Sequence, residues 1–205
     1  MYWPPPAPNK SGPAGPKTKP SNTELGALKK FLSGGQSVSF SKEKILPFLK
    51  KGKKAHYKKF SIHFGFVRKT AWGKDIALGC EGLDKIWFDA HYNLILSYKG
   101  IAIAVLGIEI VDDEILFVKQ LQGVRGRGKE LAGFRWERFL LSVFKDMFFE
   151  KGFTELRVRI AKGGWHNETR DAMFKTRYET SALRTGFKYS INRDYTFIRR
   201  EPSKK

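Results

Sequence analysis

The feature that most constrains the fold is a run of three β-strand patterns joined by two very short turns. Tyr92–Tyr98 and Ile101–Val111 are rich in β-branched and aromatic residues, and they flank Lys99-Gly100, a pair suited to a two-residue turn. Asp112-Asp113 then leads into a third such segment, Ile115–Leu121. Because a short turn returns the chain alongside the preceding strand, these segments predict an antiparallel meander.

The meander is followed by a helical pattern. Apolar residues recur at helical spacing over Glu130–Lys151, and Gly152 stands where many helices end. Residues 156–160 alternate as in a strand with one wet face, a further helix is expected within residues 167–184, and one or two closing strands within residues 187–200. We therefore expect an α/β (α+β) domain with a mixed, largely antiparallel sheet flanked by helices.

The N-terminal part has a different composition. Residues 1–20 contain seven prolines and predict a disordered, Pro-rich tail. Residues 21–59 predict a basic helical arm with two short helices. Phe60–Val67 reads as a strand and begins the folded domain, which we place at residues 60–205.

Positive charge is concentrated in this N-terminal part. Residues 1–60 hold 13 Lys and Arg against two Glu, so they carry +11 of the formal net charge of +19. A basic arm ahead of a milder domain indicates a polyanionic partner, most often nucleic acid. The candidate contacts are Lys50, Lys51, Lys53, Lys54, Tyr57, Lys58 and Lys59. The alternative is a basic segment that only solubilises the chain.

Several classes of protein are excluded by composition. The longest uninterrupted apolar run, Ile101–Ile108, is too short to cross a bilayer, and the N-terminus lacks the pattern of a signal peptide. Cys80 is the only cysteine, so we expect no internal disulfide and no cysteine-based metal site. A reducing compartment, the cytoplasm, fits best, and no metal is expected.

The third strand of the meander runs into a Gly-rich turn that opens the helix. Such a turn allows close backbone approach to a phosphate, and the N–H groups of the helix point at the anion. A Walker A loop is excluded because no Gly-Lys-Ser/Thr follows, and a Rossmann loop because a meander precedes the turn. The residues expected at the phosphates are Leu121, Gly123, Arg125, Gly126, Arg127, Gly128 and Lys129. A plain structural turn is the alternative.

Taken in order, these features resemble the GNAT acetyltransferase family. Arg125 and Gly128 match the family's Gln/Arg-x-x-Gly-x-Gly/Ala loop, which holds the pyrophosphate of coenzyme A, whereas Glu130 stands where Gly or Ala is usual. Gly186-Phe187 is similar to a second family signature. The resemblance covers about residues 92–200. It implies a GNAT-like fold with acetyl-CoA (acyl-CoA) as co-substrate.

The resemblance also implies catalytic roles. Many members of the family protonate the departing thiolate with a Tyr four residues before the Gly of Gly-Phe, where Ala182 stands here. Tyr178 lies one helical turn earlier on the same face and is the candidate substitute. Glu109 is the candidate base for the amine, with a solvated carboxylate as the alternative. The other candidate bases are Glu114, His63, His91 and His166.

Two classes of function remain open. The first is an acetyl-CoA-dependent N-acyltransferase that acts on an amine acceptor and is associated with nucleic acid. The second is a catalytically inactive GNAT-fold protein that binds nucleic acid or a ribonucleoprotein. The loop at residues 125–128 favours the first class, and Ala182 favours the second.

Overall fold

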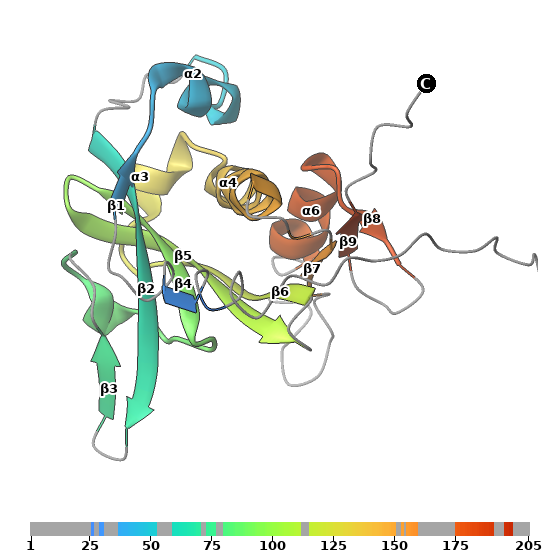
Figure 1. Cartoon of the computed structure of the whole chain (residues 1–205). Helices are drawn as coiled ribbons and strands as arrows, with labels where there is room; N and C mark the ends of the chain where they lie inside the picture. Colours follow the sequence, from blue (N-terminus) through green and yellow to red (C-terminus); the bar gives the residue numbers. More distant parts are fainter. Residues whose placement is uncertain are drawn as a thin grey trace, which may run out of the picture.

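The computed structural model describes residues 26, 29–30, 37–52, 59–70, 73–76, 80–111, 115–150, 153, 155–159, 175–190 and 195–198. They form an α+β structure around one mixed, mostly antiparallel sheet (Figure 1), which confirms the expected fold class. The strand order is β1-β2-β4-β5-β6-β7-β9-β8, with β3 paired to β2. Among these pairs, β6 and β7 are parallel and the others are antiparallel.

The strands are β1 (Ser37–Ser39), β2 (Phe60–Thr70), β3 (Gly73–Ile76), β4 (Tyr92–Tyr98), β5 (Ile101–Val111), β6 (Ile115–Gly123), β7 (Glu155–Val158), β8 (Lys188–Tyr189) and β9 (Tyr195–Ile198). The α-helices are α2 (Lys42–Ile45), α3 (Gly128–Ala132), α4 (Trp136–Glu150) and α6 (Ser181–Arg184). Two short 3-10 segments are η1 (Leu46–Phe48) and η3 (Leu83–Lys85), and the π-helical turn η4 (Thr176–Thr180) precedes α6. Within the described ranges, no helix is both long and apolar enough to cross a membrane.

The meander of β4, β5 and β6 is confirmed. Lys99 and Gly100 both have positive φ angles, +55° and +78°, as a two-residue hairpin turn with the favoured twist requires. Each of the three strands begins where the sequence predicts, and β6 extends to Gly123 instead of ending at Leu121. The second turn, Asp112-Asp113, lies outside the described residues.

The prediction of a single helix over Glu130–Lys151 is wrong, because the structure has two helices there, α3 and α4. The backbone between α3 and α4 forms hydrogen bonds with the last residue of η1 and with Lys50. Arg135 N donates to Phe48 O (2.8 Å), and Lys50 N donates to Gly133 O (3.0 Å). The apolar period continues through this break, so the periodicity contains no sign of a contact with a segment far earlier in the chain.

The described part of the N-terminal arm packs on the sheet. Strand β1 pairs with β2, and Ile45 of α2 is fully buried in the main core. The rings of Phe40 and Phe48 contact Phe139 of α4 edge-on, with centroid distances of 5.0 and 5.4 Å. Side chains from this segment, among them Ile45, therefore belong to the core of the sheet. The boundary at residues 59 and 60 stays a prediction, and the Pro-rich tail lies outside the described residues.

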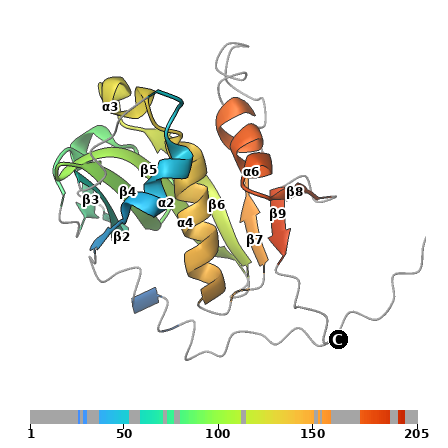
Figure 2. The ribbon, with the colours of Figure 1, turned by 90° about the horizontal axis from the view of Figure 1, so that it is seen from above.

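The two faces of the sheet are filled differently. One face packs against α4 and α6 through a large cluster that includes Leu106, Phe144 and Phe148 (Figure 2). A smaller cluster that includes Phe88 and Val105 covers part of the opposite face. This smaller cluster places residues 80–91 across the strands, beside buried polar side chains described below.

The segment of residues 80–91 comes very close to the sheet at Gly107 of β5. A Cβ at this position would lie 2.9 Å from Ala90 Cβ and 3.0 Å from Gln120 Cβ. We expect Gly107→Ala to lower the free energy of unfolding by about 1–3 kcal/mol, as overpacking usually does. Urea denaturation measures the loss, with Gly128→Ala as the control because a Cβ there meets nothing within 4 Å. Equal stability of wild type and Gly107→Ala would contradict the close approach.

Candidate functional site

Strands β6 and β7 run side by side and then separate. Their pairing extends from Ile115 with Glu155 to Val118 with Val158, and Arg159 N then donates to Val118 O (3.1 Å). Strand β6 continues to Gly123 while still paired with β5 on its other side. Figure 2 shows α6 beyond the end of β7 and beside β6. The last residues of β6 therefore present one backbone edge to the α6 region.

Tyr178 lies at this separation point. Its hydroxyl oxygen accepts a hydrogen bond from Leu121 N (2.7 Å), and its side chain is only 7% exposed. Burial raises the pKa of Tyr178, so the phenol is neutral at physiological pH. Because N–H groups alternate along a strand, the N–H of Gly123 points to the same edge as that of Leu121. The structure thus brings together three of the residues that the sequence selected.

The Gly-rich turn follows directly at the end of β6. Val124 N donates to Ile103 O (2.8 Å), and Arg127 N donates to Val124 O (3.1 Å). Gly126 has φ +85°, a conformation that residues with a side chain rarely adopt. The turn is therefore held by backbone bonds at its base.

The charges in this turn are not equivalent. Arg127 forms an ion pair with Glu130 (3.1 Å), so the acidic residue that departs from the family pattern neutralises its own neighbour. Arg125 and Lys129 are exposed. A Cβ on Gly128 would meet nothing within 4 Å. Helix α3 has five residues, so its dipole adds less than the single long helix expected there.

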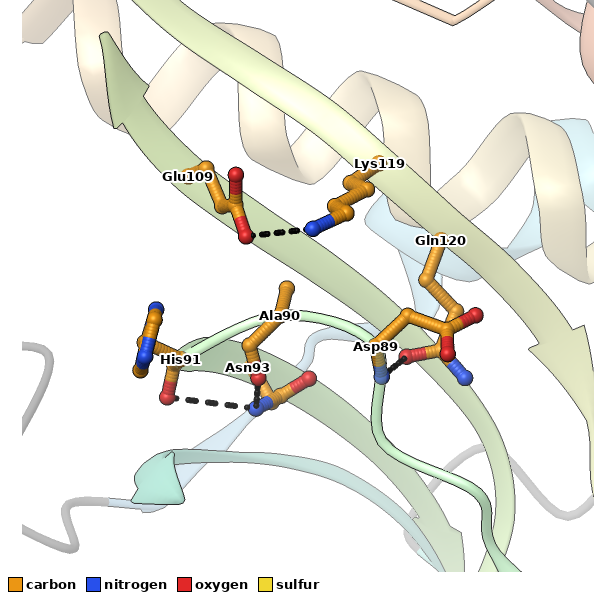
Figure 3. Close-up of polar contacts among 7 residues, drawn as sticks. All are labelled: Asp89, Ala90, His91, Asn93, Glu109, Lys119 and Gln120. Carbon is orange, nitrogen blue, oxygen red and sulfur yellow. Dashed lines mark hydrogen bonds and ion pairs between the residues drawn. The ribbon is translucent and has the colours of Figure 1, made fainter. Parts of the chain in front are cut away.

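Glu109, the proposed base, lies on the face of the sheet opposite to α4. It forms an ion pair with Lys119 Nζ (2.8 Å), and Figure 3 shows the two side chains meeting beside the loop that carries Ala90. Glu109 also lines a cavity of about 420 Å³ together with Lys29, Phe66, His91, Tyr92 and Ile110. Tyr178 belongs to the core beneath α4. The structure therefore does not bring Glu109 and Tyr178 onto one face.

A β-bulge in β6 accounts for the position of Lys119. The register with β5 shifts between Gly107 and Ile108, and Lys119 is the extra residue of β6 between Val118 and Gln120. A bulge changes the direction of the side chains around it and is common beside functional sites. Here it places Lys119 against Glu109.

Gln120 forms a polar centre that the sequence reasoning missed. Its Oε1 accepts from Asp89 N (3.0 Å), and its Nε2 donates to Trp87 O and to Gln122 Oε1 (2.7 Å). Gln120 is 2% exposed. These bonds fix the loop around Asp89 on the second face of the sheet (Figure 3).

Asn93 is a second buried polar residue on this face. Its Nδ2 donates to Ala90 O (3.1 Å) and to His91 O (3.3 Å), so the orientation of the amide is determined. Its Oδ1 has no hydrogen-bond partner among the described residues. The sequence contained a sign of this site, because Asn93 is a polar residue inside the apolar strand Tyr92–Tyr98. Buried polar atoms normally have hydrogen-bond partners, so such a residue indicates a specific polar contact.

Of the two described histidines, His63 is buried, whereas His91 is exposed and lines the cavity beside Glu109. His63 Nε2 lies 3.1 Å from Ser61 Oγ and 3.0 Å from Ser97 Oγ, in a polar cluster between β2 and β4. Burial lowers the pKa of His63, so it is mostly neutral at pH 7. His91 stacks on Phe66 with a centroid distance of 6.0 Å. Glu114 and His166 lie outside the described residues.

The structure describes three of the proposed nucleic-acid contacts. Lys50, Lys51 and Lys59 are exposed. The other four, Lys53, Lys54, Tyr57 and Lys58, lie outside the described residues. Within the described part of the chain, no group of three or more His, Cys, Asp or Glu side chains is arranged to hold a metal ion.

Two comparisons with known proteins found no relative. No protein-family model matches the chain, and no curated protein sequence matches it. The function is therefore inferred from the geometry and from the sequence pattern.

Proposed function

We propose that the chain is an acetyl-CoA-dependent N-acyltransferase with a GNAT-like fold that acts on an amine acceptor. One observation carries the proposal. Strands β6 and β7 separate at Val118; the edge of β6 that β7 no longer covers then meets the hydroxyl of Tyr178 at Leu121, and the Gly-rich turn follows directly. The order of meander, turn, helix, parallel strand and helix is the one that the family resemblance implies.

The residues of the turn suit the phosphates of acyl-CoA. Arg125 and Lys129 are exposed cations, and the space at Gly128 lets a phosphate approach the backbone. The N–H of Gly123, on the edge of β6, would polarise the thioester carbonyl. The pairing of Glu130 with Arg127 removes the conflict between a carboxylate and the pyrophosphate.

The proposed transfer forms a bond between the amine nitrogen and the acyl carbon and breaks the bond from that carbon to sulfur. Tyr178, whose raised pKa keeps it protonated, donates a proton to the departing thiolate. We assign no proton transfer to Glu109, because it pairs in register with Phe117, six residues before Gly123, and lies on the face opposite to Tyr178. Water takes the proton that the amine loses and returns one to Tyr178, so the transfer balances.

The experiment that tests this proposal is calorimetry of the full chain with coenzyme A and with acetyl-CoA. We expect binding of both, followed by release of thiol when basic peptides or polyamines are added. Absence of binding at millimolar ligand would show that the turn is purely structural. We place the reaction in the cytoplasm, because a chain with a single cysteine forms no internal disulfide and suits a reducing compartment.

A second candidate function is an inactive GNAT-fold module that binds nucleic acid or a ribonucleoprotein. It is favoured by Tyr178 and Ala182, which are both buried in the main core as ordinary packing residues are. The exposed lysines at residues 50, 51 and 59 supply the phosphate contacts in this alternative.

The contribution of the arm is tested by substitution, because β1 pairs with β2 and Ile45 lies in the core, and deletion would remove both. We expect a variant with Gln at Lys50, Lys51 and Lys59 to bind RNA or DNA more weakly. The log–log salt slope on duplex DNA should fall by about 0.9 for each phosphate that the variant no longer binds. The matched control carries Gln at three other exposed lysines, Lys85, Lys99 and Lys188. Equal slopes for the two variants would exclude the arm as a specific contact.

A further inference from the structure

The segment that crosses the sheet on the face opposite to α4 has an inner and an outer side. Its inner residues are Ile86, Phe88 and Ala90, each at most 5% exposed. Between them, Trp87 is 70% exposed and Asp89 is half-buried. In an extended chain every second side chain points to the same side. The side chains of Trp87 and Asp89 therefore both lie on the outer side, away from the sheet.

Both residues are held in place through their backbones by one buried side chain of β6. Gln120 Oε1 accepts a hydrogen bond from Asp89 N (3.0 Å), and Gln120 Nε2 donates to Trp87 O. Figure 3 shows the side chain of Asp89 beside that of Gln120. Because these bonds use backbone atoms of the segment, they leave the indole ring of Trp87 and the carboxylate of Asp89 on the outer side.

The surroundings of Trp87 are acidic although the chain as a whole is basic. Residues 80–91 contain three carboxylates and one lysine, namely Glu81, Asp84, Asp89 and Lys85. The segment therefore has a formal charge of −2 in a chain of +19. Lys119, on the same face of the sheet, is already paired with Glu109 (2.8 Å). Because charges act mainly within about 10 Å in physiological salt, this surface favours a cation as its ligand.

We propose that the ring of Trp87 and the carboxylate of Asp89 form a binding site for an alkylammonium group, such as that of a lysine side chain. The face of an indole ring attracts a cation, and a carboxylate accepts the hydrogen bonds that an ammonium group donates. A nucleobase could stack on the same ring, but the carboxylates of the segment would repel its phosphates. The site itself does not depend on acyl transfer.

The position of the site also gives it a role in the proposed reaction, and that role rests on the proposed function. Gln120 directly precedes Leu121, whose N–H donates to the hydroxyl of Tyr178 (2.7 Å). Tyr178 belongs to the core on the α4 face, so the amine would approach the edge of β6 from the opposite face. Acylation removes the positive charge of the amine. The product would therefore bind Trp87 and Asp89 more weakly than the substrate and would leave the site.

The test is a titration of the full chain with Nα-acetyl-lysine amide, which carries one ammonium group, measured by NMR on the signals of the ligand. Trp87→Ala should weaken binding about 2–30-fold, the range of a cation–π contact. Asp89→Asn should weaken it up to about fivefold, the range of an exposed ion pair, and it keeps the backbone bond to Gln120. The matched controls, Tyr189→Ala on β8 and Asp146→Asn on α4, change exposed side chains of the same kinds and should bind as wild type does.

Three results would overturn this proposal. They are absence of binding to the wild type, wild-type affinity in both Trp87→Ala and Asp89→Asn, and equal affinity for the ligand and its Nε-acetylated form. Titration of the same proteins with coenzyme A separates the site from the proposed function. If coenzyme A binds while both variants keep their affinity for the amine, the site is wrong and the acyltransferase proposal stands. If coenzyme A does not bind but both variants lose affinity for the amine, the site stands and the acyltransferase proposal fails.

Discussion

Gly128→Val is expected to abolish acyl-CoA binding while the protein stays folded. The branched side chain would occupy the space through which a phosphate must reach the backbone of the turn. The fold should tolerate it, because a Cβ at Gly128 meets nothing within 4 Å. Calorimetry with acetyl-CoA measures the affinity, and urea denaturation measures the stability.

Two companion variants make this result specific. Gly128→Ala adds one methyl group and should bind acyl-CoA more weakly than wild type but more strongly than Gly128→Val. Arg125→Ala should weaken binding by about 1–3 kcal/mol, the scale of a charge-assisted hydrogen bond. If Gly128→Val binds acyl-CoA as wild type does, the phosphates do not lie at this turn.

Tyr178→Phe is expected to lower turnover at least tenfold and to leave acetyl-CoA affinity nearly unchanged. General acid catalysis typically contributes about 10²–10⁴-fold, and phenylalanine keeps the ring but removes the proton donor. The same change leaves the N–H of Leu121 without the hydroxyl that accepts from it at 2.7 Å. The free energy of unfolding should therefore fall by about 1–3 kcal/mol.

Turnover reports on the hydroxyl of Tyr178 as a proton donor, and the free energy of unfolding reports on its hydrogen bond to Leu121. Tyr189→Phe is the matched control, because it makes the same change in a side chain that is 60% exposed. Turnover unaffected by Tyr178→Phe would remove Tyr178 as the donor and leave the acyltransferase proposal intact. A loss of stability without any measurable wild-type turnover would favour the binding module.

The sequence predicts those parts of the fold that are determined by residues close together in the chain. The hairpin at Lys99-Gly100 follows from a short turn between two strand patterns, in which Gly100 tolerates positive φ. The break before α4 was missed, because it arises from backbone bonds to Phe48 and Lys50. The helix propensity of neighbouring residues contains no information on hydrogen bonds to a segment more than 80 residues earlier in the chain. Residues 80–91 have no regular period, and their packing on the face opposite to α4 decides their path.

The candidate site shows the same division. The Gly-rich turn could be identified because its residues are contiguous, whereas the bond of Leu121 to Tyr178 joins segments 57 residues apart. The bulge at Lys119 could not be inferred from alternation, which assumes a constant register. For this reason the sequence selected Glu109 without indicating that Lys119 is its partner.

The contact of residues 48–50 with the start of α4 determines where a minimal fragment of this protein can begin. A chain trimmed to start at β2 would leave Gly133 O and Arg135 N without their backbone partners. It would also uncover Phe139, against which Phe40 and Phe48 pack. Expression boundaries and protease-resistant cores should therefore start upstream of Ser37. A fragment that keeps these contacts also keeps Lys50 and the basic segment that follows it.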